Sequence, residues 1–320
     1  MNQYTIEGSL VRNSLMKNNN GGIGKVAPNI CYMGNKQAIA GKLVYIFPKC
    51  KHFLDACCGG GSVGYSMLTY GRAEQVTMND IYEPLIVLHK TILNKEIDFE
   101  NLEWCSRERF KLALHRIDSG IYTPVDVLFK YTYSFGNNGT SYAYSVELEA
   151  LKRAMYDCIF GKTSKERRVA FRSYCRCLQS LQSLESLERL QSLQSLESLQ
   201  SLESLQSLES LQSLERTINF TNKDIYEIDY TPYDCVYFDI PYKSETYRKW
   251  SYHDGSFNHE KFWDFFMSLP QLAFASEYQA PDFVPLIKSI DKRVTMQNKT
   301  NNGMQKGKEK VYCNDKNYMI

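Results

Sequence analysis

The chain has 320 residues, of which 43% are hydrophobic and 23% are charged, and its formal net charge is +2. This balance is typical of a globular protein with a sizeable core and excludes a disordered or fibrous chain. No run of about 18 apolar residues occurs, so we expect no membrane span and no membrane partner.

The ten cysteines bear on the compartment and on metal binding. The first residues, MNQYTIEGSLVRN, contain no apolar core of the kind that a signal peptide has. We therefore expect reduced thiols and a cytoplasmic location. Cys57 and Cys58 are adjacent, Cys175 and Cys177 are two apart, and no second close pair complements either, so no metal site is predicted.

Residues 1–28 are rich in Asn and Gly and predict a flexible tail. The apolar pattern then predicts helix, strand, helix, strand and helix in turn, over 36–47, 51–56, 63–69, 75–79 and 81–94. A strand, a glycine loop, a helix and a second strand that ends in an acid form the opening of a nucleotide-binding α/β unit.

Residues 101–177 do not continue this rhythm and predict an insertion. Within them, 122–144 is rich in Tyr and contains the turn Asn137-Asn138-Gly139, and 147–158 has a helical pattern. Residues 162–176 carry six Lys and Arg against one Glu, the most basic stretch of the chain.

Residues 178–216 form a triplet repeat in which Leu returns at every third position, 13 times in all. A period of three makes an α-helical leucine row drift around the axis, yet we expect a helical shape of some kind. So many leucines need burial against the body of the protein or a second copy. Residues 178–215 carry a net −5, which leaves +7 on the rest of the chain, and their Glu side chains would repel phosphate. We therefore predict self-association or a spacer here.

The α/β pattern resumes at Ile218. Strands are predicted over 233–239 and 271–276, a helix over 257–269, and an edge strand within 310–320. The fold class is therefore mixed α/β with a Rossmann-like sheet. Its domain comprises 29–100 and 217–320, interrupted by the insertion at 101–177 and the repeat at 178–216.

The first motif that carries chemistry is the glycine loop after the first strand, DACCGGGSVG from Asp55 to Gly64. Glycines let the backbone approach a ligand closely, and Asp80 ends the next strand, where an acid can bind ribose hydroxyls. The alternatives are a tight turn followed by a helix-capping Asp80, and a dinucleotide site with one displaced glycine.

The second motif is Asp239-Ile240-Pro241-Tyr242, directly after an apolar strand. An exocyclic amino nitrogen of a base is a poor nucleophile, because its lone pair is delocalised into the ring. The Asp239 carboxylate and the Ile240 carbonyl can accept its two hydrogens and favour a tetrahedral nitrogen. Pro241 restricts the turn and Tyr242 offers a ring for stacking a base that has left the duplex. The alternative is an ordinary turn at a strand end.

The third motif is Tyr32-Met33-Gly34-Asn35-Lys36 before the first helix. In order and context, the three motifs resemble those of the D12 class of N6-adenine DNA methyltransferases, the Dam-like family that includes many phage enzymes. The resemblance covers 29–177 and 217–320. It implies a Rossmann-like methyltransferase, in the host cytoplasm if phage-encoded, that transfers a methyl group from S-adenosylmethionine to adenine N6 in DNA. The residues it assigns to the cofactor are Tyr32, Lys36, Asp55, Gly59, Gly61 and Asp80.

Two positions depart from the family pattern. Ile240 stands where DPPY has its first Pro, although the carbonyl acceptor is kept, and Cys57 stands where an aromatic often precedes the glycines. The Ile240 departure leaves open a methyltransferase-like DNA-binding protein without catalysis that assembles through its repeat. The D-x-P-Y motif by itself also leaves open methylation of another amine, such as cytosine N4 or a glutamine amide.

The family carries DNA recognition in the segment between the acidic strand and DPPY, which here includes the insertion. Tyr133, Asn137 and Asn138 are predicted to contact bases, and Arg167, Arg168 and Arg172 to contact phosphates. For the basic stretch, the alternative is a solvated helix face.

Overall fold

The computed structural model describes residues 30, 32–98, 101–144, 146–160, 163–182, 217–242, 257–293 and 306–318. The predicted tail at 1–28 and most of the repeat lie outside these residues. Residues 178–182, the first five of the repeat, continue helix α8.

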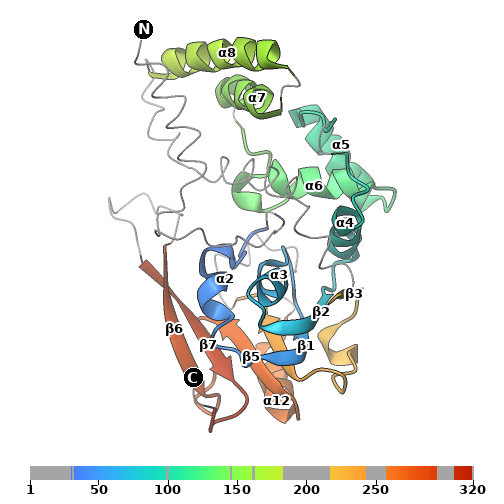
Figure 1. Ribbon diagram of the computed structural model, residues 1–320, viewed down its shortest axis with the longest axis vertical. Coiled ribbons are helices and arrows are strands. Elements are labelled where there is room, and N and C mark those ends of the chain that lie inside the picture. Colours follow the sequence, from blue (N-terminus) through green and yellow to red (C-terminus); the bar gives the residue numbers. More distant parts are fainter. Residues whose placement is uncertain are drawn as a thin grey trace.

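A seven-stranded sheet is the framework of the molecule, in the order β3-β2-β1-β4-β5-β7-β6 (Figure 1). The first five strands in this order are parallel, and β7 is antiparallel to both β5 and β6. This is the mixed α/β, Rossmann-like architecture that the sequence predicts. The strands are β1 Cys50–Asp55, β2 Ala73–Asn79, β3 Ile218–Thr221, β4 Cys235–Asp239, β5 Leu272–Glu277, β6 Leu286–Arg293 and β7 Lys306–Cys313.

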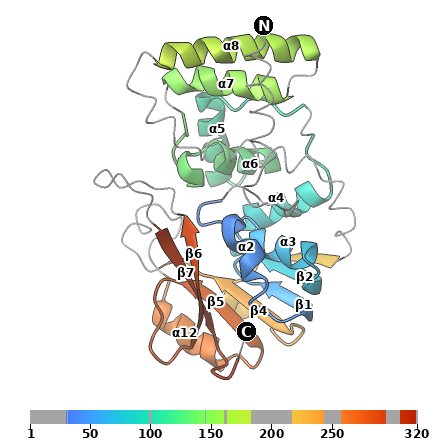
Figure 2. The same ribbon diagram turned by 60° about the vertical axis from the view of Figure 1, so that its left-hand side comes forward.

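The helices fall into two groups. Figures 1 and 2 show α2, α3 and α12 against the sheet, and α5–α8 gathered at one end of the molecule, beyond α4. The first group, with α4, comprises α2 Gln37–Leu43, α3 Ser62–Thr69, α4 Glu83–Leu93 and α12 His259–Ser268. The second comprises α5 Arg107–Asp118, α6 Pro124–Thr132, α7 Val146–Phe160 and α8 Ser164–Gln182.

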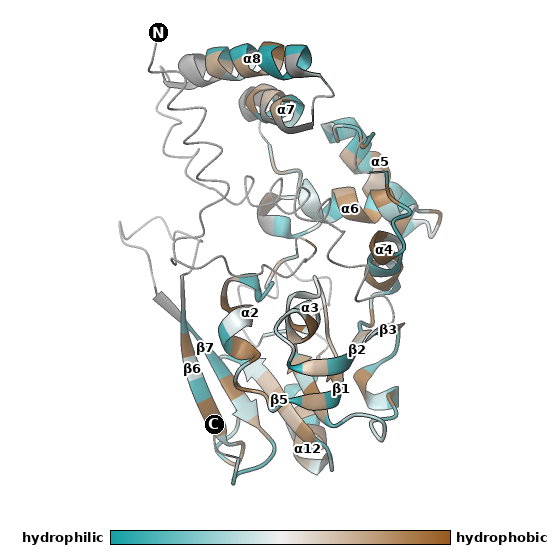
Figure 3. Ribbon diagram, in the orientation of Figure 1, coloured by the Kyte–Doolittle hydropathy of each residue, from teal (hydrophilic) through white to brown (hydrophobic). Residues whose placement is uncertain are grey.

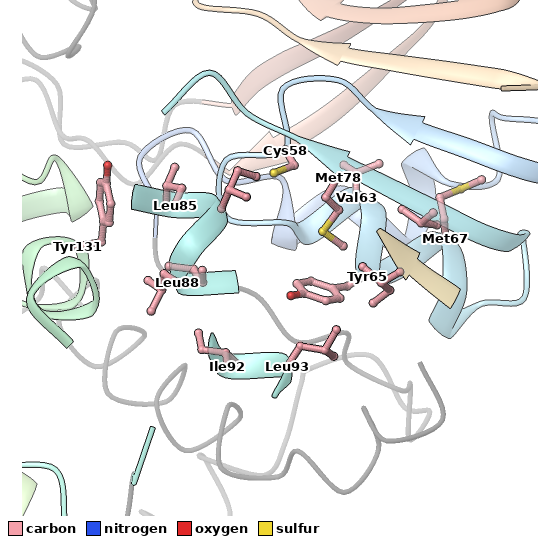
Figure 4. Packing of buried hydrophobic residues seen from close by; sticks show 14 of the residues in the cluster. Cys58, Val63, Tyr65, Met67, Met78, Leu85, Leu88, Ile92, Leu93 and Tyr131 are labelled. Carbon is pink, nitrogen blue, oxygen red and sulfur yellow. The ribbon is translucent and has the colours of Figure 1, made fainter. Parts of the chain in front are cut away.

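Two hydrophobic cores lie on opposite faces of the sheet, because neighbouring strand residues point to opposite sides. Phe53 belongs to the core that includes α2 and α3, whereas Leu54 belongs to the core that includes α12. Figure 3 shows hydrophobic residues on the strands and on the helices that cover them, and mostly hydrophilic ones on α5 and α8. The larger core continues across α4, where Figure 4 places Tyr131 of α6 beside Leu85.

The predicted strands at 51–56, 75–79, 233–239 and 271–276 are confirmed to within two residues. The predicted edge strand at the C-terminal end is wrong in position. It corresponds to β7, which lies between β5 and β6, so β6 is the edge. Charged residues such as Lys288 and Asp291 hide the apolar alternation of β6, and for that reason the sequence did not reveal it.

Parallel pairing decides where the functional motifs meet. Asp55 is in register with Met78 of β2 and with Tyr237 of β4. The carboxyl ends of these three strands therefore lie at one edge of the sheet, which is where open α/β sheets bind ligands.

We expect the core at Phe274 to dominate stability, because this fully buried ring packs against Phe47 and Tyr318 with centroids 4.9 and 5.1 Å apart. Phe274→Ala should lower the free energy of unfolding by about 3–5 kcal/mol in urea titrations. Phe283→Ala, at a ring that is 57% exposed, is the matched control and should change it by under about 0.5 kcal/mol. Equal effects of the two changes would contradict this packing.

Candidate active site at the carboxyl ends of the parallel strands

The glycine loop between β1 and α3 needs glycine at Gly59, Gly60 and Gly61, since a Cβ on Gly60 would lie 2.3 Å from the Ile30 carbonyl oxygen. Gly59 and Gly61 have φ values of +48° and +80°. A Cβ on Gly59 would lie 3.0 Å from the Tyr32 ring, and one on Gly61 would lie 2.7 Å from Tyr65. The loop therefore packs closely beneath Tyr32, as a loop must that brings its backbone up to a ligand.

Asp55, at the end of β1, is buried, and only one of its two carboxyl oxygens has a hydrogen-bond partner among the described residues. Its Oδ2 accepts a hydrogen bond from the Gly64 backbone N–H at 2.9 Å. Its Oδ1 is buried and has no hydrogen-bond partner among the residues that the structure describes. Burial, with the nearby carboxylates of Asp239 and Asp80, raises the pKa of Asp55 to about 8. An added cation or N–H donor would relieve both features.

Asp80 has a structural task. Its Oδ2 accepts from the Gly59 N–H at 2.9 Å, and its Oδ1 accepts from the Tyr82 N–H at 2.9 Å, just ahead of α4. It thus joins the glycine loop to the turn after β2. Asp80 therefore holds the turn before α4 and does not cap the helix, whose N-cap is Tyr82 without a side-chain hydrogen bond. A ribose contact would use the remaining lone pairs of the same carboxylate.

Lys36 links the motif before α2 to the end of β4. This lysine is 4% exposed, and its Nζ donates to both Asp239 carboxylate oxygens at 2.6 Å and to the Gly34 carbonyl at 3.0 Å. Asp239 itself is 22% exposed. The two sequence motifs that contain them, 203 residues apart, therefore share one charged centre.

The D-x-P-Y segment follows β4 with its side chains divided between two environments. Ile240 is 2% exposed and belongs to the core cluster on the α12 face, which accommodates the departure from Pro. Tyr242 is buried, its hydroxyl donates to Glu309, and burial raises its pKa well above the usual range. Its ring meets Tyr278 edge-on at 4.6 Å. Pro241, which lies between Ile240 and Tyr242 in the chain, is half-buried.

Two residues that sequence reasoning missed complete the site. Glu309 of β7 is fully buried, with an Oε1 3.7 Å from Lys36 Nζ. Its three lysine neighbours in KGKEK made this segment resemble a basic surface. His89 of α4 is also fully buried, and burial lowers its pKa to about 4, so it is neutral near pH 7. Its Nε2 lies 2.8 Å from the Gly59 carbonyl and its Nδ1 3.1 Å from the Tyr65 hydroxyl.

Helix α6 brings the helical group to this edge of the sheet. The Tyr131 ring lies 5.1 Å from the Tyr32 ring. Lys130, also buried, donates from Nζ to the Tyr82 hydroxyl at 2.7 Å, and burial lowers its pKa to about 8. The insertion therefore contacts both the motif before α2 and the turn after β2.

Of the three residues predicted to contact bases, Tyr133 and Asn138 are buried and Asn137 is half-exposed. Tyr133 is fully buried, with its ring 5.1 Å from Trp104 and 5.5 Å from Phe129, so its ring has no surface for a base. The aromatic-rich segment builds the core of the helical group instead. Asn138 is 4% exposed, and its Oδ1 accepts from the Thr140 and Ser141 N–H groups. Asn137 has a φ of +57° and forms the predicted turn, half-exposed.

Arg167, Arg168 and Arg172 lie exposed on α8 and line one open groove with Cys158 and Phe171. Figure 2 shows helix α8 at the end of the molecule away from the sheet. This arrangement suits either phosphate contact or a solvated helix face.

Within the described part of the chain, no three or more His, Cys, Asp or Glu residues are grouped so that they could hold a metal ion. None of the helices described is both long and apolar enough to cross a membrane.

The family model for the D12 class N6 adenine-specific DNA methyltransferase matches residues 32–124. The matched segment begins at Tyr32 and includes Lys36, Asp55, the glycine loop and Asp80. It ends before Asp239, so the D-x-P-Y segment is tied to the site by the geometry of the sheet. Methyltransferases of this family typically use S-adenosylmethionine.

The residues present fit a cofactor with a sulfonium and an ammonium group. Asp55, Asp80 and Asp239 lie near one another, since the latter two raise the pKa of Asp55, and Asp55 retains an unpartnered buried oxygen. A cationic ligand with N–H donors would stabilise this group of carboxylates.

The raised pKa of Asp55 predicts a pH dependence of stability. Its ordinary pKa of 3.8 rises to about 8 on folding, so the folded protein binds this proton more tightly than the unfolded chain. Between about pH 4 and 8 the free energy of unfolding should fall as pH rises, by up to about 1.4 kcal/mol per pH unit from this group. Asp55→Asn should remove this contribution in urea titrations at several pH values.

The exposed Asp264→Asn change serves as the control and should leave the slope unchanged. If Asp55→Asn has the same pH slope as the wild type, the assigned burial of the Asp55 charge is incorrect.

Proposed function

We propose that this protein transfers a methyl group from S-adenosylmethionine to N6 of adenine in DNA. The observation that carries the proposal is the contact of Asp239 with Lys36, which belongs to the segment 32–124 matched by the family model. The end of β4 stands in register beside β1, and Lys36, from the motif before α2, contacts Asp239 directly. Glycine loop, acids and D-x-P-Y segment thus belong to one site.

The cofactor is proposed to lie over the glycine loop, near Tyr32, Lys36, Asp55, Gly59, Gly61 and Asp80. When bound, it supplies a methyl group made electrophilic by the positive sulfur. A bound cation would lower the raised pKa of Asp55, so that this buried group, like Asp80, would offset the positive charge as a carboxylate. Neutral His89 holds the Gly59 carbonyl and so fixes the loop beneath it.

The base amine is proposed to lie between Asp239 and the Ile240 carbonyl. Each accepts one N–H, which draws the nitrogen toward tetrahedral geometry and directs its lone pair at the methyl carbon. When the nitrogen takes the methyl group, the demethylated cofactor would leave and the Asp239 carboxylate would accept the proton that the nitrogen loses. Pro241 restrains the turn, and Tyr242, held by Tyr278 and Glu309, provides the stacking ring. The base must first leave the duplex.

DNA contact is proposed for the helical group. Its basic helix α8 carries Arg167, Arg168 and Arg172 on an exposed face, and its turn at Asn137 is half-exposed. These groups would contact backbone and base edges, whereas Tyr133 and Asn138 support the segment from inside. Self-association through 178–215 remains a proposal that rests on the leucine repeat.

The reaction is tested by transfer of labelled methyl from S-adenosylmethionine to unmethylated DNA, followed by nucleoside analysis. We expect label in N6-methyladenine with the wild type. We expect Asp239→Ala to lower the rate by at least about a hundredfold, because it loses an acceptor that acts on the nucleophile. Label in N4-methylcytosine would move the proposal to cytosine. Cofactor and DNA binding without any transfer would favour a non-catalytic assembly protein.

DNA contact by α8 is tested through the salt dependence of binding. Each phosphate contact contributes about 0.9 to the slope of log K against log salt concentration. Replacing Arg167, Arg168 and Arg172 together by Ala should therefore reduce that slope by about 3 in fluorescence anisotropy titrations. The exposed lysines Lys49 and Lys316, replaced by Ala as controls, should leave it unchanged. An unchanged slope in the triple variant would assign α8 a solvated face.

A further inference from the structure

Glu309 is a fully buried carboxylate whose only proposed task so far is to hold the Tyr242 hydroxyl. It lies on β7, in register with Ile290 of the edge strand β6. A buried carboxylate is costly unless it is paired and hydrogen-bonded. Two of its partners among the described residues belong to the candidate active site: the Tyr242 hydroxyl donates to it, and Lys36 Nζ lies 3.7 Å away.

Lys36 competes with the target amine for Asp239, and Glu309 offers Lys36 a second acceptor. The ammonium holds both Asp239 oxygens at 2.6 Å, so the carboxylate that should accept an amine hydrogen is already occupied by a stronger donor. Each oxygen keeps a further lone pair for a base amine, but the ammonium draws charge away from both oxygens, so Asp239 becomes a stronger acceptor when Lys36 withdraws from one of them. Because Lys36 is buried, its charge needs another acceptor close by when it moves.

We propose that Glu309 is a positioning residue that receives the Lys36 ammonium while Asp239 holds the target amine. This role rests on the proposed function. The lysine has two carboxylates within reach, at 2.6 and 3.7 Å, and its flexible stem allows a short shift between them. The shift keeps the net charge of the site constant, so it avoids leaving a buried charge without a partner.

The bond between Tyr242 and Glu309 connects this shift to the base. The same carboxylate orients the Tyr242 ring, and Lys36 Nζ lies 4.9 Å from the centre of that ring. Glu309 thereby contacts both the stacking ring and the lysine that pairs with Asp239. A purely structural role would need only a hydrogen-bond acceptor for Tyr242, which an amide also supplies.

The first experiment uses Glu309→Gln, which keeps shape and acceptor but removes the charge. In single-turnover methyl transfer at saturating cofactor and DNA, we expect a rate about tenfold to a hundredfold below the wild type. The dissociation constants of S-adenosylmethionine and DNA should stay within about twofold. Glu309→Asp should restore part of the rate, and the exposed Glu74→Gln control should match the wild type. An unchanged rate in Glu309→Gln would overturn the proposal.

The second experiment needs no activity and so separates this proposal from the proposed function. In Asp239→Asn, the Lys36 ammonium should rely on Glu309. Adding Glu309→Gln should then raise the unfolding equilibrium constant about tenfold more than the same change does in the wild type, measured in urea. Equal effects in the two backgrounds would show that Glu309 does not receive Lys36. If the two substitutions are coupled but the wild-type protein methylates no DNA, the proposed reaction is refuted and the role of Glu309 toward Lys36 stands.

Discussion

The parallel pairing of β4 with β1 is the constraint on which the site depends. It sets Asp55 beside Tyr237 and so brings the end of β4 next to the glycine loop, although the helical group and the repeat separate the two strands in sequence. The ion pair of Lys36 with Asp239 then closes the centre from the side of α2. Each motif alone is an ordinary turn or cap, and the register of two strands makes them one chemical environment.

That environment is predominantly anionic, whereas the proposed contact with DNA requires basic side chains. The carboxylates of Asp239 and Glu309 lie 2.6 and 3.7 Å from the Lys36 ammonium, and Asp55 and Asp80 lie at the ends of the neighbouring strands. Arg167, Arg168 and Arg172, in contrast, are exposed on α8. The two tasks are therefore separated in space: carboxylates suit a positively charged cofactor, and a distant basic face suits a polyanion. Helix α6 connects the two regions through its contacts with Tyr32 and Tyr82.

The sequence predicts the parallel strands and the glycine loop well, because buried strands are continuous apolar runs and left-handed turns need glycine. It fails where tertiary context decides burial. Glu309 stands among lysines, yet the alternation of β7 turns it inward while Lys308 is exposed. Tyr133 has the composition of a contact residue, yet it fills the core of the helical group. Strand β6 carries charges because it is an edge, and this removes the signal that would reveal it.

The order of the strands along the chain has a consequence for biosynthesis. Strand β2 ends at Asn79 and its neighbour β3 begins only at Ile218, while Glu309 arrives near the C-terminal end. Local helices can form as the chain emerges, but the sheet closes only after a long loop has been bridged, which is entropically costly and slow. A ribosome that stops before β7 therefore releases a chain with the glycine loop complete and the charged centre unfinished. Such a chain lacks Glu309 and with it one of the two carboxylates beside Lys36.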